Sequence, residues 1–151
     1  MSTDAPFKIL VVEDQALLAM ELEYVLRELG HDVIGCAMDA EEAMAMAGAT
    51  APDVALVDMN LRDGPSGRDV AQSLNQTYGT VAVFLTANPE QIPSCFAGAL
   101  GVLVKPFESQ TLRDVLIFAG QFAKDGTIGE IPQRFRLAPW VLEAPPATDQ
   151  V

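Results

Sequence analysis

The sequence predicts an α/β fold, namely a doubly wound five-stranded parallel sheet with five helices distributed over both faces. Short apolar runs with strand character alternate with segments in which apolar residues recur at helical spacing. The central runs are apolar throughout rather than at every second residue, as expected for parallel strands buried on both faces. Five strand–helix units in this order favour a single sheet with crossover helices.

Five apolar runs mark the expected strands. They cover residues 9–12 (ILVV), 33–37 (VIGCA), 54–59 (VALVDM), 81–86 (VAVFLT) and 102–104 (VLV). The first run ends abruptly in two adjacent carboxylates, Glu13 and Asp14, and an amphipathic pattern follows at once. A pair of negative charges therefore stands at the mouth of a hydrophobic core.

The first two expected helices have recognisable ends. In the first, leucine and valine side chains between residues 18 and 29 share one face, and Gly30 supplies a C-terminal stop. The second is expected to begin at Asp39, and Glu42 three residues later completes a pattern like a capping box. A helix is therefore expected on each side of the second strand.

Three further helices are expected. Turn-forming residues 63–66 (DGPS) lead into the third helix. A short, weaker helix is expected between Pro89 and Ala97, and the last helix runs from about Ser109 to Ala123. The stretch that holds the fourth helix is short, so this helix is expected to be brief or irregular.

The end of the chain differs from the domain expected at residues 1–124. Residues 125–151 contain four prolines, show no clean hydrophobic period and are too few for a second domain. We expect a tail without an output domain. Three alternatives stay open for it: a mobile tail, docking on its own domain, or docking on a partner. Apolar residues suited to docking are Ile131, Phe135, Leu137, Trp140 and Val141.

Composition limits the possible partners and the location. A formal net charge of −12 without a basic patch argues against direct binding to nucleic acid or to an anionic membrane, although not against a cation. No apolar stretch approaches the roughly 18 residues of a membrane span, and no leader-like segment is visible at the N-terminus. Only two cysteines occur, which suits a reducing compartment. We expect a cytoplasmic protein.

Three carboxylates are expected to meet in one pocket. Glu13 and Asp14 follow the first strand, and Asp58 ends the third. Ligands of open parallel sheets bind beyond the carboxyl ends of the strands, and in the order 2-1-3-4-5 the first and third strands are neighbours. Two unit charges about 4 Å apart repel by roughly 4 kcal/mol at an effective dielectric constant of 20. Because a hard divalent ion with oxygen ligands offsets this repulsion, we expect Mg²⁺ there.

A lysine and a threonine end two other strands at the same rim. Lys105 ends the fifth strand in LVKPF, and Thr86 ends the fourth. Burial of the long lysine side chain at this position would be unusual unless an anion lay near its ammonium group. These groups suit phosphoryl transfer to a carboxylate, with Asp58 as the nucleophile that forms an aspartyl phosphate. The metal and Lys105 would neutralise the phosphoryl oxygens, and Thr86 can donate a hydrogen bond to one of them.

Four motifs in order, VVED, LVDMNLRDGPSG, FLTAN and LVKPF, resemble the receiver domain of bacterial two-component response regulators over about residues 7–123. The resemblance implies a flavodoxin-like fold and phosphorylation of Asp58 by a sensor histidine kinase. It also implies Mg²⁺ bound by Asp14, Asp58 and the backbone carbonyl of Asn60, with Glu13 assisting.

The resemblance further implies a switch. It implies a cis peptide at Lys105–Pro106 and a movement of Thr86 that rearranges the face of helix four, strand five and helix five. Val102 stands where the family often has an aromatic switch residue on strand five. The phrase VFLTAN resembles a receiver subgroup with a Phe-x-Thr signature, whose members are frequently stand-alone proteins paired with unorthodox histidine kinases.

The main functional prediction is a single-domain response regulator. It would signal through protein contacts at that face or act as a phosphoryl sink, and a homodimer stays open. One alternative is a metal-dependent phosphatase with an Asp nucleophile, which usually has an acid where this chain has Asn60. Another is a receiver-like interaction module that works without phosphorylation. A nucleotide-binding fold is excluded because VVEDQA replaces the glycine-rich first turn.

Overall fold

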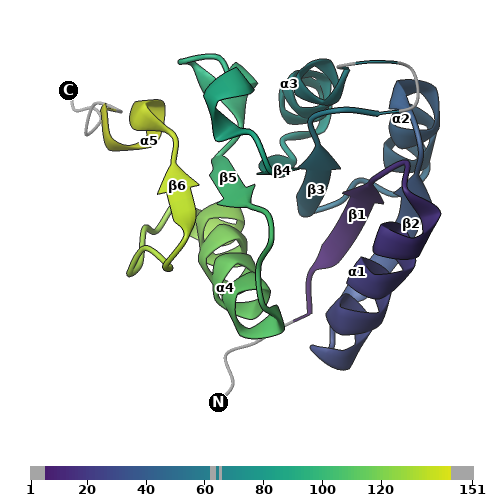
Figure 1. Ribbon diagram of the computed structural model, residues 1–151, viewed down its shortest axis with the longest axis horizontal. Helices are drawn as coiled ribbons and strands as arrows, with labels where there is room; N and C mark the ends of the chain where they lie inside the picture. Colours follow the sequence, from purple (N-terminus) through teal and green to yellow (C-terminus); the bar gives the residue numbers. More distant parts are fainter. Residues whose placement is uncertain (1–5, 62–63, 65, 144–151) are drawn as a thin grey trace.

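Six strands form one sheet in the order β2-β1-β3-β4-β5-β6 (Figure 1). The computed structural model describes residues 6–61, 64 and 66–143. The first five strands are parallel and follow the predicted order, which is confirmed, whereas the sixth runs antiparallel to β5 and was not predicted. The strands are β1 (Lys8–Val12), β2 (Asp32–Ala37), β3 (Val54–Asp58), β4 (Val81–Thr86), β5 (Gly101–Val104) and β6 (Phe135–Leu137).

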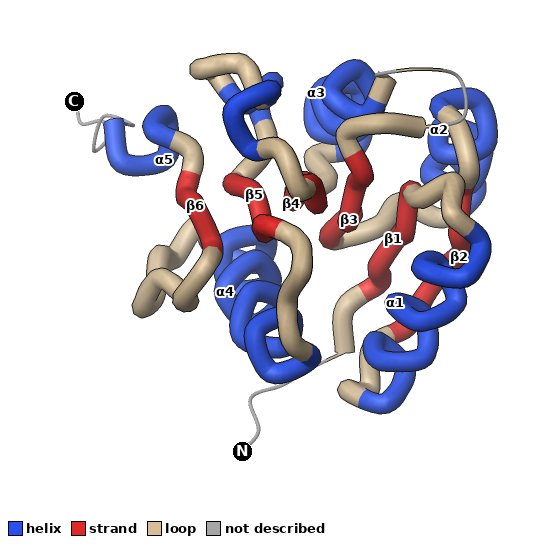
Figure 2. The backbone as a smooth tube through the Cα atoms, viewed as in Figure 1, coloured by secondary structure: helices blue, strands red, loops and turns tan. Residues whose placement is uncertain are grey.

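Helices cover both faces of the sheet (Figure 2). The described α-helices are α1 (Ala16–Glu28), α2 (Ala40–Ala49), α3 (Gly67–Tyr78), α4 (Ser109–Asp125) and α5 (Pro139–Glu143). Side chains of α1 and α4 pack on one face with Ile9 and Val11, and those of α2 and α3 pack on the other with Leu10 and Val12. Successive residues of a strand point to opposite faces, so burial on both explains the uninterrupted apolar runs. None of the described helices combines the length and hydrophobicity needed to span a bilayer.

The expected ends of the first two helices are confirmed. Gly30 adopts a φ of 91° directly after the C-cap of α1, a conformation that costs glycine little. At the start of α2, Asp39 Oδ1 accepts a hydrogen bond of 2.9 Å from the amide of Glu42. Glu42 Oε1 in turn accepts one of 2.8 Å from the amide of Met38. Of the turn predicted before α3, residues 63 and 65 lie outside the described residues.

The stretch between Pro89 and Ala97, where a brief or irregular helix was expected, is irregular and holds two short 3₁₀ helices instead of an α-helix. They are η1 (Pro89–Gln91) and η2 (Phe96–Gly98). Pro93 lies between them and has no amide hydrogen to continue a helix. Phe96, Ala97 and Gly98 then take φ values of 55°, 48° and 82°, which lie in the left-handed region.

Residues 134–143 of the expected tail dock on the domain itself, and these are the last residues that the structure describes. β6 pairs with β5 so that Phe135 lies opposite Leu103 and Arg136 opposite Val102. Phe135 and Val141 are buried in the core that α1 and α4 cover. Between β4 and β5 the described chain forms 3₁₀ turns instead of an α-helix, and β6 covers the edge of β5 that belongs to the expected partner face.

The start of α3 lies against the end of β3 through Gly67. The amide of Gly67 donates a 3.1 Å hydrogen bond to the carbonyl of Met59. A Cβ atom added at Gly67 would lie 2.7 Å from Met59 Cα and would also clash with the carbonyl oxygen of Asp58. Both neighbours are backbone atoms that cannot turn away, so only glycine fits beside the strand that carries Asp58.

Replacing Gly67 with alanine is expected to lower the free energy of unfolding by about 1–3 kcal/mol, because overpacking forces α3 away from β3. Urea unfolding followed by circular dichroism measures this loss. Gln72→Ala, at an exposed position of the same helix, is the matched control and is expected to change stability by less than about 0.5 kcal/mol. Equal stabilities of the two variants would contradict the close approach.

Candidate functional site

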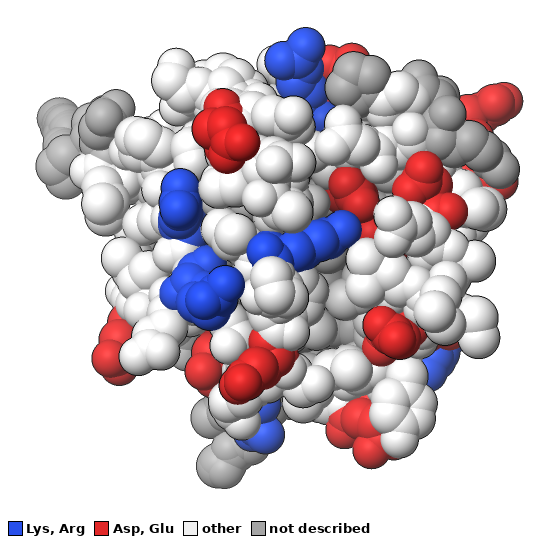
Figure 3. Space-filling model, viewed as in Figure 1, with Lys and Arg blue, Asp and Glu red and all other residues white. Residues whose placement is uncertain are grey.

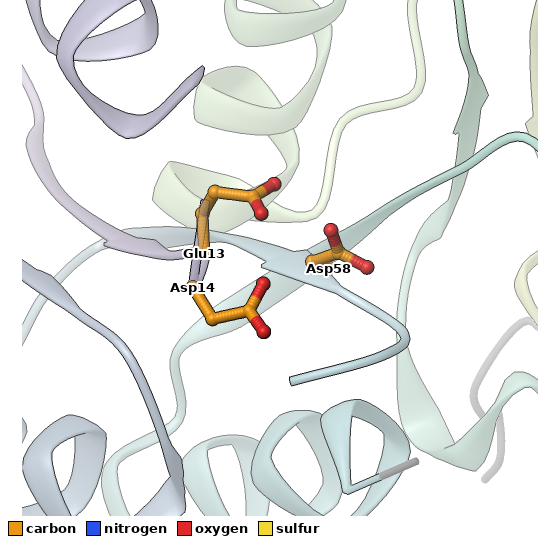
Figure 4. Close-up of side chains that lie close together, drawn as sticks. All are labelled: Glu13, Asp14 and Asp58. Carbon is orange, nitrogen blue, oxygen red and sulfur yellow. The ribbon is translucent and has the colours of Figure 1, made fainter. Parts of the chain in front are cut away.

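Three carboxylates converge where β1 and β3 end (Figure 4). Glu13 and Asp14 directly follow β1, and Asp58 is the last residue of β3, the strand paired with β1. One carboxylate oxygen from each of the three lies within 4.8 Å of those of the others. The predicted convergence is therefore present, and the parallel pairing of β1 with β3 produces it.

Local hydrogen bonds orient two of these carboxylates. Glu13 Oε2 accepts a hydrogen bond of 3.1 Å from the amide of Gln15, and Asp58 Oδ1 accepts one of 2.8 Å from the amide of Asn60. Figure 4 shows the side chains of Glu13 and Asp14 extending toward Asp58. Glu13 is only 1% exposed and Asp58 is also buried, so both charges are separated from bulk water.

Lys105 supplies the positive charge of the pocket. Its Nζ lies 3.1 Å from Asp58 Oδ2 and 3.5 Å from Glu13 Oε1. Lys105 follows β5, so its side chain extends past the end of β4 to reach β3. One ammonium cannot balance three carboxylates, and a formal negative charge remains.

Thr86 and Asn60 lie at the rim of this pocket. Thr86 ends β4 and is buried, and its hydroxyl oxygen accepts a hydrogen bond of 3.0 Å from the amide of Asn88. The carbonyl of Thr86 accepts one of 2.9 Å from the amide of Lys105, which ties the ends of β4 and β5 together. The structure thus places Thr86 beside the site with its hydroxyl engaged by its own loop. The assignment of the Asn60 carbonyl to metal stays a prediction.

Burial raises the pKa of Glu13 from its ordinary value of 4.5 to about 7. A hydrogen bond shared with Asp58 adds to the increase, while the amide of Gln15 and the charge of Lys105 oppose it. A proton is therefore held between two carboxylates at a pH where both would be ionised in water. The proton supplies positive charge that the pocket lacks.

The donor set fits a hard divalent cation. All three side chains of the cluster offer carboxylate oxygens, which Mg²⁺ prefers as ligands. A divalent cation would also offset the excess negative charge that Lys105 leaves unbalanced. Asp58 also has the features of a nucleophile, because it is held in place by the amide of Asn60 and accompanied by an ammonium. The residues present therefore suit both Mg²⁺ and an anionic reaction partner.

Sequence reasoning missed two contributors to the site. Gly67 permits the backbone of α3 to approach Asp58, yet in the sequence it follows turn-forming residues and carries no signal of a close contact. The amide of Gln15, which holds Glu13, belongs to a residue whose side chain suggests nothing. Backbone groups of this kind are visible only once the chain is folded.

The raised pKa of Glu13 predicts a pH dependence of stability in metal-free solution. The unfolded chain releases this proton near pH 4.5, whereas the folded chain keeps it until about pH 7. The unfolded state therefore binds fewer protons in this window, and the free energy of unfolding falls as the pH rises through it, by up to about 3 kcal/mol. Urea unfolding in chelator between pH 4.5 and 7.5 measures the slope.

Glu13→Gln isolates this contribution. The variant is expected to lose much of the fall between pH 4.5 and 7, because glutamine retains an acceptor oxygen but does not titrate. Glu130→Gln, at an exposed carboxyl far along the chain, is the control and is expected to keep the wild-type slope. A wild-type slope in Glu13→Gln would assign the pH dependence to other groups.

Comparison with known proteins places this architecture in a family. Residues 9–117 match the family model described as the response regulator receiver domain. The chain is 35% identical over 118 residues to the phyllosphere-induced regulator PhyR of Methylorubrum extorquens, covering 77% of this chain and 44% of that protein. It is 35% identical over 120 residues to the transcriptional regulatory protein PdtaR of Mycobacterium tuberculosis, covering 74% of this chain and 57% of that protein. The chain spans about half the length of these relatives.

A solved structure agrees with the sequence comparison. The solution structure of the receiver domain of Erythrobacter litoralis PhyR matches with a TM-score of 0.73 and 28% identity, covering 85% of this chain and 100% of that domain. The match confirms the flavodoxin-like arrangement expected from the motifs, and the relatives place the chain in two-component signalling. From the family match across residues 9–117, the chain belongs to the response regulator receiver domain family.

Proposed function

We propose that this chain is a phosphorylation-controlled signalling switch whose Asp58 accepts a phosphoryl group from a sensor histidine kinase. One observation carries the proposal: a buried carboxylate, Asp58, lies 3.1 Å from the ammonium of Lys105 and beside two further acids. Phosphoryl transfer requires a nucleophile, a nearby cation and oxygen ligands that can hold a hard metal ion, and this pocket contains residues suited to each role. Family membership supports the same role.

The chemistry transfers one group between two side chains. An oxygen of Asp58 attacks the phosphorus of a phosphohistidine, a P–O bond forms, and the P–N bond breaks with its electron pair returning to the histidine nitrogen. Lys105 stabilises the charge on the phosphoryl oxygens, which requires only a short movement from its present contact with Asp58. Later hydrolysis of the aspartyl phosphate restores Asp58, so the chain acts as a signalling acceptor rather than as an enzyme with an outside substrate.

Mg²⁺ fits beside this reaction. We assign its binding to Asp14, Asp58 and the backbone carbonyl of Asn60, with Glu13 assisting, and when bound the ion would add positive charge next to the phosphoryl oxygens. The close carboxylates support this assignment. In the absence of the ion, Glu13 is hydrogen-bonded to Asp58, and Asp58 is hydrogen-bonded to Lys105.

Thr86 is proposed to sense the phosphoryl group. Its hydroxyl hydrogen can be donated to a phosphoryl oxygen, while its oxygen now accepts from the amide of Asn88. Turning toward the phosphoryl group would exchange one hydrogen bond for another and would move the start of the loop that follows β4. The switch is then a shift between two arrangements of this loop.

The partners follow from charge and from the relatives. Figure 3 shows Lys and Arg side chains over β5, β6 and the loop after β5, which favours approach of an anionic phosphodonor to a chain of net charge −12. We propose that residues 1–124 act as the receiver domain in the cytoplasm. Output would pass to a downstream protein, because the acidic chain is poorly suited to nucleic acid. PhyR of Bartonella quintana is described as an anti-anti-sigma factor, which is consistent with output through protein contacts.

Intact-mass spectrometry after incubation with acetyl phosphate and Mg²⁺ tests the proposal. The wild-type chain is expected to gain one phosphoryl group, and Asp58→Asn or chelator is expected to abolish the gain. Lys105→Met is expected to slow uptake about 10- to 100-fold, because it removes a charge-assisted hydrogen bond worth about 1.5–3 kcal/mol.

Lys124→Met is the matched control, since Lys124 is an exposed lysine of α4, and it is expected to react at the wild-type rate. Uptake that persists in Asp58→Asn would move the acceptor elsewhere. No uptake from acetyl phosphate or from a phosphorylated cognate kinase would favour the interaction module that works without phosphorylation.

A further inference from the structure

The C-terminal segment, defined here as residues 134–143, occupies the edge of β5. β6 supplies the strand pairing, and the amide of Ala138 extends it with a 2.8 Å hydrogen bond to the carbonyl of Leu100. Trp140 Nε1 donates a 2.8 Å hydrogen bond to the carbonyl of Ala99, and Phe135 is buried. The segment is therefore held by backbone pairing and by anchored aromatic side chains. Figure 1 shows it at one end of the sheet.

The edge of β5 is shaped to receive this segment. A Cβ atom added at Gly101 would lie 2.5 Å from the carbonyl oxygen of Arg136 and 2.5 Å from the ring of Phe135. A larger residue at position 101 would therefore push the C-terminal segment off the sheet. Without the segment, β5 would present unpaired backbone groups that suit an extended strand of a partner protein.

The C-terminal segment contacts both loops that lead from the phosphoryl-binding residues. Arg134 Nη2 donates a 3.3 Å hydrogen bond to the carbonyl of Pro106, the residue after Lys105. Ala99, which accepts the bond from Trp140, ends the stretch that begins after Thr86. A displacement of either loop reaches the segment directly, without passing through the hydrophobic core.

The resting contacts of these loops set the direction of the coupling. Lys105 now bonds Asp58, and the Thr86 hydroxyl now accepts from the amide of Asn88. On phosphorylation both groups would turn to the phosphoryl oxygens. Movement of Lys105 would displace the neighbouring Pro106 carbonyl, which Arg134 contacts, and release of the Asn88 amide would loosen the stretch that contains Ala99. Each change would weaken a contact of the C-terminal segment.

We propose that the C-terminal segment is a reversible intramolecular cap on the edge of β5 and that phosphorylation of Asp58 releases it. This inference rests on the proposed function of Asp58. Linkage makes the coupling reciprocal: phosphorylation weakens docking by the same free energy by which docking disfavours the phosphorylated state. Release would expose the edge of β5 to a strand of a partner protein only while Asp58 is phosphorylated.

The chain carries its own reporters of docking. Trp140 is the only tryptophan, and its ring packs edge-on against Phe122 with centroids 6.1 Å apart. Gly101→Ala, in which the C-terminal segment is expected to be undocked, gives the red shift of Trp140 fluorescence for full release. When Mg²⁺ and beryllofluoride, a phosphoryl analogue, are added to the wild-type chain, the emission of Trp140 is expected to shift to the red by more than half of that amount. Hydrogen exchange of the Ala138 amide, followed by NMR, is expected to accelerate about 5- to 150-fold, the usual range of allosteric coupling. Asp58→Asn should show neither response.

The outcomes separate the cap from the function of the site. If neither phosphoryl group nor beryllofluoride binds at Asp58, the proposed function fails. If beryllofluoride binds while the Ala138 amide keeps or increases its protection, the cap is overturned and the proposed function stands. Gly101→Ala changes a residue of the sheet itself, so its effects could have another origin. Arg134→Gln, at a surface position, tests the cap without changing the sheet.

Arg134→Gln removes the contact with Pro106 while leaving β6 in place. It is expected to speed exchange of the Ala138 amide before beryllofluoride is added and to reduce the further acceleration afterwards. Arg113→Gln, an arginine of α4 outside the cap, is the control and is expected to behave like wild type. A wild-type response in Arg134→Gln would overturn the route through Pro106.

Discussion

An excess of negative charge at the carboxyl ends of β1 and β3 is the constraint on which the rest of the molecule depends. Parallel pairing of these strands forces Asp58 beside the acids that follow β1, and burial removes the water that would screen them. Lys105 crosses from β5 to reach them, and Glu13 keeps a proton to about pH 7. Under the proposed function, the pocket would exchange this proton for a metal ion and the Lys105–Asp58 contact for contacts with a phosphoryl group.

The first five strands and the convergence of the acidic side chains could be predicted from the sequence because their signals are local. Uninterrupted apolar runs identify parallel strands, and a charged residue at the end of such a run must lie at the rim where strands end. β6 could not be predicted in this way. It has only three residues in a proline-rich stretch, and it forms a strand because it pairs with the edge of β5, which is distant in the sequence. Gly101 leaves room for that pairing. The stretch 89–98 was expected to hold a brief or irregular helix, but its left-handed turn at Phe96 could not be predicted, since that turn depends on tertiary packing.

Val102 changes how a signal can leave the pocket. The receiver family often has an aromatic switch residue at this position, which is coupled to the threonine that ends the fourth strand. Valine is short and branched at Cβ, with a stiff first torsion, and here it is buried against the opposite strand. It cannot report on Thr86 by rotating. The remaining connections are backbone ones, through the loops that end at Ala99 and begin at Lys105, and these are the loops that the C-terminal segment contacts.

The size of the cap suits this role. It consists of a three-residue strand and a five-residue helix, joined to α4 by residues 126–133, which are largely exposed. So small an interface gains a few buried side chains and hydrogen bonds, and it loses the backbone freedom of about ten residues at roughly 1–2 kcal/mol each. The cost of ordering these residues offsets much of that gain, so we expect the docking equilibrium to have a modest free energy. A coupling of about 1–3 kcal/mol from one phosphoryl group can shift such an equilibrium, whereas it could not displace a full helix of the core.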